Sequence, residues 1–146
     1  MKQKKHNGLT LLELLIALSI VIVLSGGVFL SFRQTPQRVL HSALIQMQAD
    51  LRYAQRRAII EGRRVSVEFD STARMYRIII IDTGEEIRRV YLDRNITIGL
   101  GAGTNRVTYL PRGSVSGART ISLTIEGVTK RLSITPASGR TYLLDS

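Results

Sequence analysis

Residues 4–30 of the chain read KKHNGLTLLELLIALSIVIVLSGGVFL, and this stretch governs the organisation of the whole protein. The 22 residues from Leu9 to Leu30 contain a single ionisable side chain, that of Glu13. About 20 apolar residues in a helix, at about 1.5 Å each, cross the roughly 30 Å hydrocarbon layer of a bilayer. Lys2, Lys4 and Lys5 favour a cytoplasmic N-terminus. The sequence therefore predicts one membrane span, with the rest of the chain outside the cytoplasm.

Two simpler interpretations of the apolar run stay open. A secretory signal peptide has an uncharged apolar region of roughly 7 to 15 residues, followed by a small-residue cleavage site. The present run is longer and contains Glu13, although Ser25, Gly26 and Gly27 imitate such a cleavage site. A plain single-pass anchor explains every feature of the run except Glu13.

Glu13 is the most informative residue of the run. An acid inside a span costs about 2.5 to 3.5 kcal/mol on insertion scales, and such residues are usually paired and functional. No basic residue occurs between Lys5 and Arg33, so the span offers no cation. Cleavage after Gly8 would give Leu9 a free amine, one helical turn from Glu13. The same amine in a neighbouring molecule would pair with Glu13 and set the register of two packed helices.

Residues 4–8 (KKHNG) and 9–13 (LTLLE), followed by a long apolar helix, resemble a prepilin leader, a class III signal. The resemblance implies that a prepilin peptidase cuts after Gly8 and methylates Leu9, and that Glu13 guides assembly. Leu9 differs from the phenylalanine that is commonest at the first mature position. The implied partners are other pilins or pseudopilins, the peptidase/methyltransferase, an inner-membrane assembly platform and the membrane itself.

The rest of the chain predicts one more helical segment and a β-rich domain. Residues 31–62 continue the helix, with a possible bend at Pro36 and a stop at Gly62. Apolar residues form a stripe at steps of three and four: Leu40, Leu44, Met47, Leu51, Ala54 and Ala58. Alternating residues and turn signals in residues 63–146 predict short strands. The organisation is therefore a leader (1–8), a transmembrane helix (9–30), an extracytoplasmic part of that helix (31–62) and a head (63–146).

The predicted fold class is α+β: a long N-terminal transmembrane and amphipathic helix packed on a β-rich, pilin-like head. The unalternating apolar run from Ile78 to Ile81 predicts a strand buried on both faces. Residues 109–113 (YLPRG) and 138–140 (SGR) resemble the GspH/FimT branch of minor pilins and pseudopilins, although turn chemistry alone also accounts for them. That resemblance implies a subunit near the tip of a type II secretion pseudopilus or type IV pilus, or one that primes assembly.

The composition excludes several kinds of chemistry. The chain has no cysteine, which removes disulfides, thiolate metal sites and cysteine nucleophiles. Its two histidines, His6 and His41, lie in the leader and the helix, so the head cannot form a histidine triad or histidine metal cluster. We therefore expect no enzymatic activity, no metal and no cofactor.

The positive charge supports an alternative function. Without the leader, the chain keeps 18 basic and 11 acidic residues. A cluster of arginines suits phosphates, and the candidates for DNA or partner binding are Arg112, Arg119, Arg131 and Arg140. Some FimT-like members are associated with DNA uptake through a Gly-Arg-x-Arg tail; this chain has Gly139 and Arg140 but Tyr142 in place of the second arginine. Solvated arginines, or arginines paired with acids of neighbouring subunits, are the explanation of the charge that we favour.

Overall fold

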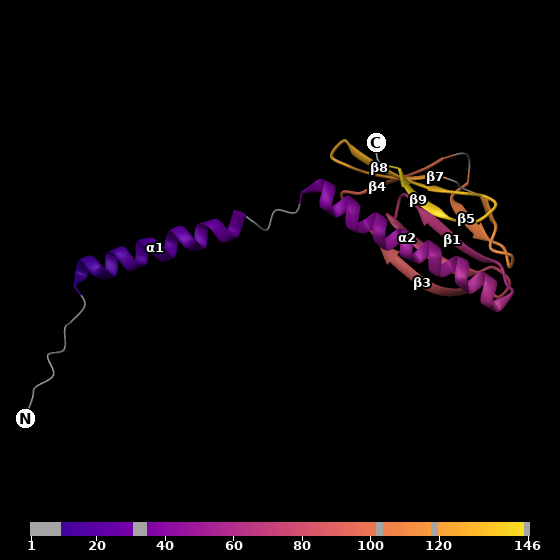
Figure 1. The fold of residues 1–146 in the computed structure, drawn as a ribbon, viewed down its shortest axis with the longest axis horizontal. Coiled ribbons are helices and arrows are strands. Elements are labelled where there is room, and N and C mark those ends of the chain that lie inside the picture. Colours follow the sequence, from indigo (N-terminus) through magenta and orange to yellow (C-terminus); the bar gives the residue numbers. More distant parts are fainter. Residues whose placement is uncertain (1–9, 31–34, 102–103, 118–119, 145–146) are drawn as a thin grey trace, which may run out of the picture. The chain divides into compact units, whose positions relative to one another are not determined.

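The computed structural model describes residues 10–30, 35–101, 104–117 and 120–144, and in residues 23–30 it describes the backbone alone. The chain divides into two compact units, residues 1–34 and residues 35–146. Figure 1 shows the helices and strands of both units.

The first unit contains helix α1, Leu11–Leu30. Thr10 precedes it, and the side-chain oxygen Oγ1 of Thr10 accepts a hydrogen bond from the backbone N–H of Glu13 at 3.3 Å. Such a bond satisfies one of the free N–H groups at a helix start. The leucines of its first turns are exposed. Among the described residues, no helix reaches the length and apolarity that crossing a membrane requires.

The second unit begins with helix α2, Pro36–Glu61. Pro36 occupies its first turn, where the missing N–H is no loss, and Gly62 ends it in the left-handed conformation, with φ of 62°. All six apolar residues of the predicted stripe are fully buried, which confirms the face of α2 that packs on the head. Residues 31–34 lie outside the described residues, so the continuity of the helix across them stays a prediction.

Two antiparallel sheets form the head (Figure 1). The order in the first sheet is β3-β2-β1-β5-β6. Its strands are β1 (Val65–Asp70), β2 (Met75–Ile80), β3 (Glu85–Tyr91), β5 (Arg106–Tyr109) and β6 (Val115–Gly117). The order in the second sheet is β4-β7-β8-β9. Its strands are β4 (Thr97–Leu100), β7 (Thr120–Ile125), β8 (Val128–Ile134) and β9 (Thr141–Leu144).

Helix α2 packs against both sheets, touching β1 and β5 of the first and β7, β8 and β9 of the second. The buried stripe of α2 and the inward residues of the strands form one apolar core, in which Val67, Ile78, Leu123 and Leu132 are fully buried. This arrangement confirms the predicted fold class, α+β with a helix packed on a β-rich head.

Two expectations about the strands need correction. Strand β2 alternates: Tyr76, Ile78 and Ile80 are buried, whereas Ile79 is only half-buried. The prediction of a strand buried on both faces is therefore wrong, because only the face of β2 that carries Tyr76, Ile78 and Ile80 packs into the core. The strands β6 and β9 were not predicted, because they have only three and four residues, too few to form a clear alternating pattern.

Candidate functional site

The predicted processing and assembly residues lie at the N-terminus of the chain. Gly8 and Leu9 fall outside the described residues. Glu13 lies in the first turn of α1 and is exposed. The proposed pairing of Glu13 with the amine of Leu9 therefore stays a prediction.

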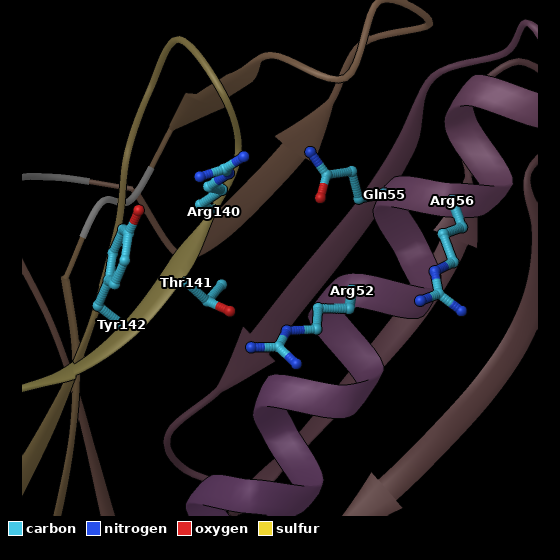
Figure 2. A pocket seen from close by; sticks show the side chains of 6 residues that line it. All are labelled: Arg52, Gln55, Arg56, Arg140, Thr141 and Tyr142. Atoms are coloured by element: carbon cyan, nitrogen blue, oxygen red, sulfur yellow. The ribbon is translucent and has the colours of Figure 1, made fainter.

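A hollow of about 410 Å³ lies where α2 meets the C-terminal end of the chain (Figure 2). Helix α2 contributes Arg52, Gln55 and Arg56. Arg140 comes directly before β9, and Thr141 and Tyr142 are the first two residues of that strand. Arg52 and Arg56 are four residues apart and so lie on the same side of the helix, one turn from each other. They fall outside the buried stripe, which leaves both side chains exposed.

Gln55 ties two distant turns to α2 beside this hollow. Its side-chain nitrogen Nε2 donates to the carbonyl oxygen of Gly113 at 2.9 Å and to that of Ser138 at 2.8 Å. Gly139 has φ of 64°, and a Cβ atom at this position would collide with Nε2 of Gln55 and with the Gly113 carbonyl oxygen. The turns that carry Arg112 and Arg140 therefore meet over one residue of α2, and only glycine fits at position 139.

The cations of the hollow are not neutralised by the protein itself. Within the part of the chain that the structure describes, Arg52, Arg56 and Arg140 form no ion pair. Five other arginines do pair with carboxylates: Arg57, Arg64, Arg77, Arg88 and Arg89. The hydroxyl oxygen Oγ1 of Thr141 is also buried and has no hydrogen-bond partner among the described residues. Three guanidinium groups and one hydroxyl group without a partner are hydrogen-bond donors of the kind that bind oxyanions.

The four arginines singled out from the sequence do not share one location. Arg140 lines the hollow, whereas Arg112 lies in the turn after β5 and donates from Nε to Oγ of Ser114 at 2.9 Å. Arg131 is exposed on β8, opposite Leu144 of β9 in the register. Arg119 falls outside the described residues. The binding role of these four residues stays a prediction.

Sequence reasoning missed Arg52 and Arg56 as site residues. Their spacing of four, outside the apolar stripe, was the available signal, but it is equally typical of an ordinary solvated helix face. What brings them together with Arg140 is the contact of Gln55 with the turn at Ser138, which lies 83 residues further along the chain.

A second polar cluster is buried under α2. Asp50 is 2% exposed and accepts hydrogen bonds from the Tyr76 hydroxyl at 2.6 Å and from Nη1 of Arg88 at 2.7 Å. Gln46 adds a third, from Nε2 at 3.2 Å. Burial, together with the hydrogen bond to Asp50, raises the pKa of Tyr76 well above its usual range. The cluster joins α2 to β2 and β3, so its role is structural. No group of three or more potential metal ligands occurs among the described residues.

Solved structures of similar fold define the class of protein. The type IV minor pilin FimU of Pseudomonas aeruginosa is 22% identical, with a TM-score of 0.61 over 73% of this chain and 88% of that chain. The minor pseudopilin EpsH of the Vibrio cholerae type 2 secretion system is 18% identical, with a TM-score of 0.60 over 72% and 95%. The fold is therefore that of a pilin-like subunit. No curated protein matches the chain.

The family follows from the sequence. The model for "Type II transport protein GspH" matches residues 43–139, and the model for the "Prokaryotic N-terminal methylation motif" matches residues 3–29. The chain belongs to the GspH family. This family consists of structural subunits and is not known for enzymes. The motif and the family together imply a membrane-anchored filament subunit that assembles with other pilins or pseudopilins.

Proposed function

We propose that this minor pseudopilin or pilin is held in the inner membrane by one span, residues 9–30, with its head outside the cytoplasm. A prepilin peptidase cuts it after Gly8 and methylates Leu9, and an assembly platform inserts it into a filament. Its place is near the tip of a type II secretion pseudopilus or a type IV pilus, or at the start of assembly, where it supports protein secretion.

One observation carries the proposal: a methylation motif at residues 3–29 precedes a GspH head within one chain. Glu13 gives the arrangement its mechanism. The run from Leu9 to Leu30 contains no cation that could pair with Glu13. An unpaired acid in lipid is unfavourable by about 2.5 to 3.5 kcal/mol, so Glu13 favours contact with the amine of a neighbouring subunit over a solitary state in the bilayer.

Substitution of Glu13 tests the mechanism. Glu13→Gln removes the charge but keeps the size, so we expect normal membrane insertion and cleavage but roughly tenfold less protein in purified filaments. Glu13→Asp keeps the charge and serves as the matched control, with a smaller loss. The measurement is quantitative immunoblotting of the filament and membrane fractions. Equal incorporation of Glu13→Gln and the wild type would refute the pairing.

The charge of the head supports a second candidate function, binding of DNA for uptake. From Thr35 onwards the chain has 17 basic and 10 acidic residues. Tyr142 is half-exposed next to Arg140 and offers a ring on which a base can stack. Contacts to phosphates release counterions, so a DNA-binding head must lose affinity steeply as salt rises. A salt series with duplex DNA that gave flat or undetectable binding would remove this candidate.

A further inference from the structure

We propose that the hollow lined by Arg52, Arg56, Arg140 and Thr141 is a docking site for an acidic peptide segment of an adjoining filament subunit. The inference rests on the proposed function, because it takes the neighbours of this head to be protein subunits. The ligand chemistry is that of two carboxylate groups presented close together.

The charge of the hollow favours an external anion. Arg52, Arg56 and Arg140 face one open space of about 410 Å³, and none has a carboxylate partner within the described residues. Like charges that line one space repel each other, and an anion between them relieves that repulsion. The planar fork of a guanidinium group binds the two oxygens of a carboxylate at once. Three such forks exceed what one carboxylate needs, which favours a segment with two acids.

The hydroxyl group of Thr141 supports a ligand independently of charge. Thr141 is 5% exposed, and its Oγ1 has no hydrogen-bond partner among the described residues. Buried hydroxyls normally have a partner, because leaving one without a partner is costly. Figure 2 shows Thr141 between Arg140 and Arg52, at the wall of the hollow. A carboxylate bound by the arginines provides the acceptor that this hydroxyl lacks.

The site is held in place before any ligand arrives. The two hydrogen bonds from Gln55 fix the turn at Ser138 to α2, on the same side as Arg52 and Arg56. The carbonyl oxygen of Thr141 accepts a further bond from Nε2 of Gln48 at 3.1 Å. A preorganised site loses less conformational entropy when it binds its ligand. These bonds fix the backbone that carries Arg140 and Thr141 relative to the helical arginines.

The compactness of the hollow favours a short acidic peptide over a nucleic acid. Duplex DNA carries a charge about every 1.7 Å along its axis, so a protein that binds it usually spreads its cations along a track. Here three arginines line one hollow, while Arg112 binds Ser114 and Arg131 lies on β8. One localised group of arginines matches a short segment that carries two carboxylates.

Titration of the full-length protein in detergent micelles with tetraglutamate peptide tests the site. We expect saturable changes in the Nε–Hε NMR signals of Arg52, Arg56 and Arg140. We expect Arg140→Gln to weaken binding about tenfold, as loss of a charge-assisted contact does. Arg131→Gln is the matched control, because it removes the same charge from an exposed arginine on β8. It should change the affinity less than twofold.

Thr141→Val separates the specific site from general positive charge. The change keeps the shape of the side chain and the net charge of the protein, but it removes the hydroxyl group that has no partner. We therefore expect tetraglutamate to bind about fivefold to tenfold more weakly. The same variant should unfold at the wild-type temperature or above it, because it removes an unpaired buried group. Wild-type affinity in Thr141→Val would show that the hydroxyl takes no part, and it would overturn the proposed site.

Two further outcomes would also overturn the proposal. Equal weakening by Arg131→Gln and Arg140→Gln would show diffuse attraction rather than a site. Tighter binding of duplex DNA than of tetraglutamate, with a selective loss in Arg140→Gln, would assign the hollow to nucleic acid. Wild-type incorporation into filaments is measured in parallel. Normal incorporation without peptide binding refutes this inference alone, whereas failed incorporation of the wild type refutes the proposed function.

Discussion

Among single side chains, two buried tyrosines differ in a way that can be measured. The rings of Tyr76 and Tyr109 are both fully buried. The hydroxyl of Tyr76 donates to Asp50 at 2.6 Å, whereas that of Tyr109 has no hydrogen-bond partner among the described residues. The same removal of one oxygen atom should therefore destabilise the protein at position 76 but not at position 109.

We expect Tyr76→Phe to lower the free energy of unfolding by about 1.5 to 3 kcal/mol, because it removes a hydrogen bond to a charged group. Tyr109→Phe removes only an unsatisfied hydroxyl, so its free energy of unfolding should stay unchanged or rise by up to about 1 kcal/mol. Urea unfolding followed by circular dichroism measures both. Destabilisation of Tyr109→Phe by as much as Tyr76→Phe would contradict the assigned hydrogen bonding.

The two tyrosines also predict how stability depends on pH. Burial raises the pKa of both hydroxyls above the ordinary value of about 10. The folded state therefore keeps protons that the unfolded state loses above that pH. The two tyrosines contribute fully to the free energy of unfolding below a pH of about 10. Above that pH, the free energy of unfolding falls by about 1.4 kcal/mol per pH unit for each tyrosine. Urea unfolding from pH 9 to 11.5 checks this, and Tyr109→Phe should have a shallower slope than wild type.

Among secondary-structure elements, helix α2 links the core to the hollow and shows how far sequence patterns reach. Its apolar stripe was predictable, because residues at steps of three and four share one helix face. Asp50 was not, because a periodicity count treats an acid as solvent-exposed. Its partners Tyr76 and Arg88 are 26 and 38 residues further along the chain. Such long-range pairing depends on strand register, which no local pattern encodes.

The residues that line the hollow also depend on long-range contacts that local sequence patterns do not encode. Arg140 stood out because it follows a glycine in a recognisable turn. Arg52 and Arg56 could be identified as site residues only from the structure, in which Gln55 binds that turn to α2. The position of Gln55 in the middle of a helix did not indicate that its side chain binds two backbone carbonyl groups. The sequence therefore predicted Arg140 as a site residue, but it did not predict which other residues lie beside it.

Gly139→Ala tests the contact between α2 and the turn. Position 139 has φ of 64°, and an added Cβ would displace the side chain of Gln55. The matched control is Gly127→Ala, where φ is 80° and no atom lies within 4 Å of the added Cβ. We expect the control to lose about 1 to 2 kcal/mol from backbone strain alone. Gly139→Ala should lose at least about 1 kcal/mol more. Equal losses in urea unfolding would show that the Gln55 contact contributes nothing.

Taken as a whole, the protein joins two units with different requirements. Residues 35–146 form a head with its own core and two sheets, whose stability depends on side chains packed within it. The apolar side chains at the start of α1 are exposed, and we propose that lipid or neighbouring helices cover them. The sequence predicted a head that begins at residue 63, whereas the compact unit begins at residue 35 and includes α2.

The proposed pairing of Glu13 depends on cleavage that exposes the amine of Leu9. Its most direct test is the intact mass of the native protein from purified filaments. We predict a mass that lacks residues 1–8 and includes one added methyl group on Leu9. A full-length, unmethylated chain in working filaments would contradict the account, because the counter-ion of Glu13 would then not exist.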